Sequence, residues 1–318
     1  MGRRSIWSKQ EVIDLSEQFV AATDEVWRLQ NGDDPECKHF QKFADVGHYR
    51  AHKSTRQGIY VCTPSGVLLG SMNTHNTDAV LNMMKESLTK YAAMEKQERL
   101  LPADADIKPK SRPEFRFPEN GLDLSMFVRD LPASGEPDGE RDAAWNQDRI
   151  WFSQAEARKF LPEDVGSLAV GDDYSLPQMI VDRFARFALI DTARGQTTHY
   201  QPEEVADSRV QGTITAINGS TIQISFVGST SASSPKSRGR EYPHGIGTKL
   251  LGKASYDLEK NRFVEFEWVA IGTRWGRTVF NGRSRKLEES PIGFVIRLAA
   301  EDAQRIAPAF LFAYGANW

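Results

Sequence analysis

The chain has 318 residues, enough for two domains of ordinary size. Its net charge of −3, with acidic and basic residues interspersed, argues against a nucleic-acid or membrane partner recognised by bulk charge. Two cysteines are too few for a disulfide-built secreted module, and no apolar run reaches the roughly 18 residues of a spanning helix. The N-terminal stretch lacks the apolar segment of a signal peptide. We therefore expect a soluble, cytoplasmic protein.

The first hundred residues alternate between helical and extended patterns. "SKQEVIDLSEQFV" predicts a helix in which Ser8 is the N-cap and Glu11 stands at the capping-box position. "FVAATDEVW" predicts a short buried strand, and "PECKHFQKFADVG" predicts a helix with Pro35 at its start. "GIYVCT" and "VLLGSM" flank a tight turn and predict a hairpin. A long amphipathic helix follows in "NTDAVLNMMKESLTKYAA".

This order of helix, strand, helix, hairpin and helix resembles the thioredoxin superfamily over residues 7–91. The resemblance implies a thioredoxin-like α/β domain. Family members that exchange disulfides carry a Cys-x-x-Cys pair at the start of the first long helix and a cis-proline before the hairpin. Here "MGRRSIW" and "STRQGIYV" stand at those places, without cysteine or proline. The resemblance therefore implies the fold and argues against the redox activity.

The rest of the chain predicts a linker and a β-rich region. Residues 102–118 are proline-rich and charged, which is typical of an extended linker after a first domain at residues 1–101. Residues 119–207 mix a strand with helical patterns, among them "SQAEARKFLP", in which Ser153 and Glu156 fit a capping box. Residues 208–318 read as consecutive strands, including a hairpin at Asn218-Gly219 and a late strand in "AFLFAYG".

Strands joined by turns without intervening helices favour an antiparallel sandwich or barrel. The predicted fold class is therefore α+β and multidomain: a thioredoxin-like N-terminal domain, a mixed segment and a C-terminal antiparallel β-sandwich or barrel. A single domain spanning residues 119–318 is the alternative. In "NRFVEFEWVAIG", alternation places Val264, Phe266 and Trp268 on the buried face and Phe263 and Glu265 on the other.

The candidate thiol is Cys37, because Lys38 and His39 beside it would lower a thiol pKa if they lie close enough. Cys62, in the middle of a predicted strand, is interpreted as a small buried hydrophobic residue. A weak metal hypothesis joins Cys37 with three histidines, although the spacing of the first two does not match paired zinc ligands; the histidines are His39, His48 and His52.

Aromatic and arginine groups in the later two thirds are candidate ligand-binding residues. Trp145 and Trp151 could line a carbohydrate or cation site, or plug a domain interface. Arg194 before a glycine could form an anion-binding corner, or the segment could be an amphipathic helix with an Asp182–Arg186 pair. Trp275 is a candidate ligand-binding residue in a hairpin rich in arginine, which could stack on nucleic acid or could be a solvated rim. The arginines are Arg274, Arg277, Arg283 and Arg285.

None of these patterns fixes a reaction, and no nucleotide, protease or hydrolase motif is present. The leading hypothesis is a non-redox protein that binds or scaffolds an unknown protein or small-molecule ligand. It needs no cofactor, and neither nucleic acid nor a membrane is expected as partner. The alternatives are an enzyme with its site in the later two thirds, or a thiol- or peroxide-handling protein that uses Cys37.

Overall fold

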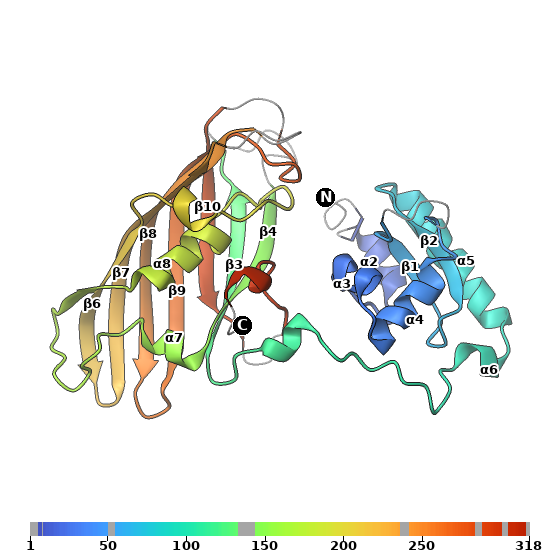
Figure 1. The fold of residues 1–318 in the computed structure, drawn as a ribbon, viewed down its shortest axis with the longest axis horizontal. Helices are drawn as coiled ribbons and strands as arrows, with labels where there is room; N and C mark the ends of the chain where they lie inside the picture. Colours follow the sequence, from blue (N-terminus) through green and yellow to red (C-terminus); the bar gives the residue numbers. More distant parts are fainter. Residues whose placement is uncertain are drawn as a thin grey trace. The chain divides into compact units, whose positions relative to one another are not determined.

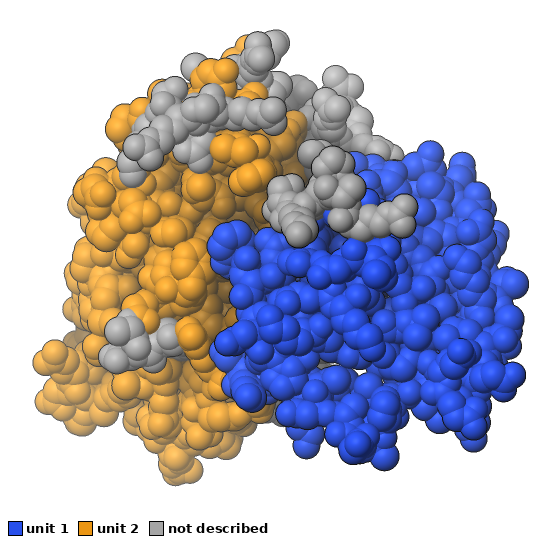
Figure 2. Space-filling model, turned by 45° about the vertical axis from the view of Figure 1, so that its right-hand side comes forward, with its two compact units in different colours: residues 1–112 blue, residues 113–318 orange. Residues whose placement is uncertain are grey.

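The computed structural model describes residues 6–7, 9–49, 55–132, 144–235, 242–283, 288–300 and 305–315. The chain divides into two compact units, residues 1–112 and residues 113–318, which Figure 2 colours blue and orange. Each unit has a hydrophobic core of its own. The chain is therefore α+β, with a two-stranded sheet in unit 1 and an eight-stranded antiparallel sheet in unit 2.

Unit 1 consists of short helices around one hairpin (Figure 1). In chain order its elements are α2 (Gln10–Ser16), α3 (Val26–Asn31), α4 (Pro35–Ala44), β1 (Ile59–Cys62), β2 (Leu68–Met72), α5 (Thr77–Ala93) and α6 (Lys96–Arg99). Strands β1 and β2 pair antiparallel, as predicted. Asn76 caps α5 by accepting the Ala79 N–H. Helix α5 packs on β2 at Gly70, where a Cβ would collide with Met83 and Ser87.

The strand predicted in residues 19–27 does not form. Residues 20–25 have no regular structure, and α3 begins directly after them. The reason is the acidic pair at the end of that segment. The Glu25 carboxylate accepts the N–H groups of Trp27 and Arg28, which caps α3, and Asp24 forms an ion pair with Arg28 at 2.7 Å. Ser8, the predicted cap of the first helix, lies outside the described residues.

Unit 2 is built on one antiparallel sheet with strand order β4-β3-β10-β9-β8-β7-β6-β5 (Figure 1). Its strands are β3 (Leu122–Asp130), β4 (Trp145–Phe152), β5 (Asp173–Ser175), β6 (Arg209–Asn218), β7 (Thr221–Ser234), β8 (His244–Asp257), β9 (Arg262–Trp275) and β10 (Ser290–Leu298). Strand β4 falls in "WNQDRIWF", for which no strand was predicted. Strands from residues 119–207 and strands from residues 208–318 belong to this one sheet.

The predicted sandwich or barrel is wrong for the described part of the chain, because the sheet is open and no second sheet faces it. Helix α7 (Gln154–Arg158), helix α8 (Gln178–Arg183) and the π-helical turn η2 (Phe184–Ala188) cover one face instead (Figure 1). The Ser153–Glu156 capping box of α7 forms as predicted. Glu156 also forms a buried ion pair with Arg183 of α8 at 2.5 Å, which joins the two helices.

The covered face, here called the inner face, is filled by aromatic rings around Trp268. The Trp268 ring lies 4.6 Å from Phe184 of η2, 5.0 Å from Phe266 and 5.2 Å from Phe226 between ring centroids. Gly252 stands opposite Trp268 on β8, and any Cβ there would overlap the indole. The Trp268 ring therefore lies over Gly252 of the neighbouring strand, where only glycine leaves room for it.

Strand β9 confirms the alternation from Phe266 onward and corrects it before that point. Phe266 and Trp268 are buried and Glu265 is exposed, as predicted. Phe263 is buried and Val264 exposed, the reverse of the prediction. Ser255 of β8 pairs with Glu265 and Tyr256 pairs with Phe263, so Val264 is an extra residue in β9. This β-bulge reverses the sides on which Phe263 and Val264 lie.

Two further expectations concern the turns and the C-terminal segment. The β6–β7 hairpin forms, with Asn218 paired to Thr221, so its two loop residues are Gly219, at φ +59°, and Ser220. The strand predicted in residues 309–315 does not form; a short 3-10 turn, η4 (Leu311–Ala313), lies there. Its rings pack on η2, with Tyr314 5.3 Å from Phe187, and the Ala309 N–H donates to Asp148 of β4.

We predict that truncating an isoleucine to alanine lowers stability strongly on the inner face and only slightly on the opposite face. Ile296 of β10 is buried, whereas the Ile271 residue of β9 is 59% exposed. Ile296→Ala should lower the free energy of unfolding by about 2–5 kcal/mol, and Ile271→Ala by about 0.5 kcal/mol or less. Urea titration of both variants measures the difference. Similar losses in the two variants would contradict this assignment of the faces.

Candidate binding face on the open sheet

The face of the sheet opposite the helices, here called the outer face, carries a continuous row of apolar side chains. Each member stands directly beside the next on the neighbouring strand, from β7 through β8, β9 and β10 to β3. This outer row consists of Val227, Leu251, Val269, Val295 and Phe127. Leu251 is 66% exposed, and Phe127 at the end of the row is half-buried. Neighbouring strands lie about 4.8 Å apart, so the row is about 19 Å long.

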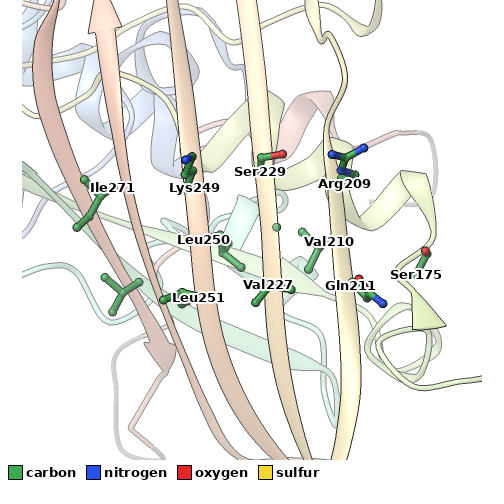
Figure 3. Close-up of a pocket in the computed structure, with 12 residues that line it drawn as sticks. Ser175, Arg209, Val210, Gln211, Val227, Ser229, Lys249, Leu250, Leu251 and Ile271 are labelled. Atoms are coloured by element: carbon green, nitrogen blue, oxygen red, sulfur yellow. The ribbon is translucent and has the colours of Figure 1, made fainter. Parts of the chain in front are cut away.

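The outer face is hollowed at one end of this row, where Val227, Leu251 and Val269 line the hollow (Figure 3). A depression of about 600 Å³ opens over β6, β7, β8 and β9. Figure 3 shows Val227, Leu251 and Ile271 around it, with Gln211 and Lys249 among the polar side chains. Because most of its lining is apolar and open to solvent, the depression fits apolar groups that project from a larger partner.

Positive charge borders the outer row. Within two positions of the row along each strand, the outward charged side chains are Arg129, Lys249, Lys253, Arg297 and Glu267. The one acidic member, Glu267, forms an ion pair with Lys253 at 3.4 Å, and Arg297 lies 5.1 Å above the Phe127 ring. The apolar row is therefore set in a surface with a local excess of positive charge.

The sequence prediction missed this face, although a signal for it was present. Each strand that supplies the outer row places an inward apolar residue beside an outward one, as in Phe226-Val227, Leu250-Leu251 and Phe294-Val295. Alternating strands of a sheet with one wet face have polar residues at the second of these positions. A run of such pairs at one level of consecutive strands therefore indicates that both faces are apolar there.

The structure does not bring Trp145 and Trp151 together. Trp145 opens β4 and is 49% exposed, whereas Trp151 is buried, donates its Nε1–H to Asp123 at 3.1 Å and meets Phe117 edge-on. Six residues of strand separate them by about 20 Å. Burial raises the pKa of the Asp123 carboxyl, and the nearby Arg149 and Trp151 oppose that rise. The pair cannot line one carbohydrate or cation site.

Arg194 lies in a buried ionic cluster, where it donates to Asp130 at 2.5 Å. The predicted Asp182–Arg186 pair is not the contact that forms: Asp182 accepts a hydrogen bond from Gln178.

Trp275 is the last residue of β9, and its ring packs against Gly245 of β8 at that end of the sheet. The arginines near it were interpreted as a solvated hairpin rim, which is wrong for Arg274 and Arg283, because both are buried. Arg285 lies outside the described residues.

The candidate thiol and its neighbouring histidines do not converge. Cys37 is buried beside Arg28; His39 meets Phe43 edge-on, and His48 contacts the Gln57 carbonyl oxygen at 3.2 Å. His52 lies outside the described residues, and those described contain no group of three or more histidine, cysteine or acidic residues placed to hold a metal ion. Cys62 is exposed, in contrast to its predicted burial.

The environment of Cys37 shifts its thiol in the direction opposite to the prediction. Burial raises the pKa of the Cys37 thiol, the adjoining Asp34 carboxylate adds to the rise, and the Arg28 guanidinium opposes it. Lys38 is exposed on the outer side of α4. The thiolate, which is the reactive form, is therefore disfavoured at neutral pH.

Comparison of the chain with family models, with curated proteins and with solved structures gives no match. Among the described helices, none combines the length and the apolar character needed to cross a bilayer.

We predict that alkylation distinguishes the two cysteines. At pH 8, iodoacetamide should modify Cys62 at least about tenfold faster than Cys37, because Cys62 is exposed and Cys37 is buried. The thiol pKa is raised in both residues, so access of the reagent makes the difference. Mass spectrometry of the two peptides over time measures the rates, and denatured protein, in which the rates should converge, is the control. Faster modification of Cys37 would favour the thiol-handling alternative.

Proposed function

We propose that unit 2 is a binding module whose outer face docks an acidic, amphipathic segment of a partner protein. The observation that carries this proposal is the outer row, five apolar side chains in register across five strands. An exposed, contiguous apolar patch rimmed by polar residues is typical of a protein interaction site. Its length of about 19 Å corresponds to about 13 residues of α-helix.

The charges around the row select the partner. Four basic side chains and one acidic side chain border it, and the acidic one is already paired with Lys253. A second copy of this face would bring like charges together, which disfavours self-association. An acidic partner satisfies the basic border while its apolar side chains cover the row and enter the depression beside it.

Unit 1 carries a separate proposal. We propose that it is a thioredoxin-like domain without redox activity, which the hairpin β1–β2 and the helix α5 packed on it support. The buried Cys37, with its raised thiol pKa, favours the non-redox reading over the thiol-handling alternative.

We predict that a synthetic peptide of about 18 residues, helical, with leucines on one face and glutamates on the other, binds the full chain. Leu251→Asp should weaken this binding at least tenfold, because it places a carboxylate in the centre of the apolar contact. Fluorescence anisotropy of the labelled peptide measures affinity. Val170→Asp is the matched control, since Val170 is also exposed, in the loop before β5.

Charge reversal tests the partner's sign. Lys249→Glu should weaken the acidic peptide and strengthen a lysine-bearing peptide of the same apolar pattern, and added salt should reduce both effects. Two other results would contradict the proposal. One is Leu251-dependent self-association in sedimentation. The other is binding to phosphatidylserine vesicles without binding to either peptide.

A further inference from the structure

A buried ionic cluster lies at the end of the inner face where β3 and β9 finish. Its centre is Arg283, in the loop after β9. The Arg283 guanidinium donates to both oxygens of Asp130, at 2.8 and 2.6 Å, and to both oxygens of Asp191, at 2.8 and 2.5 Å. Arg194 donates to Asp130 as well. The two carboxylates are thus already the partners of these two arginines.

Arg274 is the third arginine of this cluster and lacks such a partner. It belongs to β9, beside Ile246 of β8 and Ser290 of β10. Its side chain is 9% exposed, and its Nε has no hydrogen-bond partner. Its closest acidic atom is an Asp191 oxygen at 4.0 Å, beyond hydrogen-bond distance. The Arg274 side chain is therefore nine-tenths buried, and its Nε–H has no hydrogen-bond acceptor.

Three further buried polar residues belong to the same end of unit 2. Thr192, next to Asp191, has a buried hydroxyl without a partner. The Tyr200 ring is buried 5.6 Å from His244, and burial, reinforced by the charge of Asp191, raises the pKa of the Tyr200 phenol, which stays a neutral donor. His244 contacts the Tyr242 carbonyl oxygen through Nδ1 at 2.9 Å, so Nδ1 carries the proton in that hydrogen bond.

A buried cation without a partner is costly, because the protein interior replaces water poorly as its solvent. Asp191 and Asp130 attract Arg274 only through space, because their oxygens accept hydrogen bonds from Arg283. Burial, with the charges of Arg283 and Arg194, outweighs that attraction and lowers the pKa of Arg274. The planar guanidinium fork matches a carboxylate or phosphate group, which can accept two of its N–H donors at once. We propose that Arg274 holds a small oxyanion, a carboxylate or phosphate group, at the buried end of the inner face.

This oxyanion site is separate from the peptide-binding outer face, because Arg274 points to the inner side of β9. Its role does not depend on the proposed function. The anion-binding corner expected around Arg194 and Gly195 is thereby replaced by a different proposal, because Arg194 donates to Asp130 and the arginine of the proposed site comes from β9.

Thermal unfolding of the full chain tests the site. Inorganic phosphate and acetate are added at constant ionic strength, with chloride as the reference salt. At about ten times the dissociation constant, the binding anion should raise Tm by about 3–6 °C. Arg274→Met should abolish this rise and should itself have a higher Tm than the wild type in chloride. Arg262→Gln, which removes an exposed arginine at the other end of β9, should leave the rise unchanged.

Calorimetry of the folded wild type provides a readout that does not depend on a destabilising variant. A saturable heat with one site per chain, weakened at least tenfold in Arg274→Lys, supports the site, because lysine keeps the charge and loses the fork. Acetate acting alone assigns a carboxylate ligand, and phosphate acting alone assigns a phosphate ligand. The proposal fails if neither anion binds, or if Arg274→Lys and Arg274→Met respond to the anions as the wild type does.

Discussion

The open sheet of unit 2 depends on one layer of aromatic side chains between its inner face and the α8–η2 segment. A sheet of eight strands must bury one face, yet the helical cover here is short. Trp268 and the phenylalanines around it supply the missing volume, since each large ring buries far more surface than an aliphatic residue. The layer leaves no need for a second sheet, and so it leaves the outer face free.

The inner and outer faces of the same strands therefore differ in burial. The inner residues hold the fold together, while the outer row is exposed although it is apolar. At one end of the inner face the aromatic layer gives way to the ionic cluster of Arg283, Asp130 and Asp191, where the loop after β9 is fastened to β3. The aromatic core, the exposed apolar row and the ionic cluster thus lie on one sheet and share no side chains.

Local signals in the sequence predicted the local features, and contacts between distant residues decided the rest. Hairpins, the Ser153–Glu156 capping box and the inward turn of Phe266 depend on neighbours within a few residues, so spacing reveals them. Arg283 and Asp130 are 153 residues apart, and no spacing rule links them. The choice between a sandwich and an open sheet likewise depended on where α8 packs. In β9 the extra residue Val264 makes a β-bulge that reverses the sides of Phe263 and Val264, and simple alternation along the sequence does not show it.

An open sheet also has two edges, and each must be protected from pairing with another chain. On one side β5 is only three residues long, too short to template a partner strand. On the other side β4 has eight residues, and Asp148 on it accepts the Ala309 N–H of the C-terminal segment. That segment, whose rings pack on η2, lies against this edge strand, and an edge covered by the same chain is less accessible to a second chain.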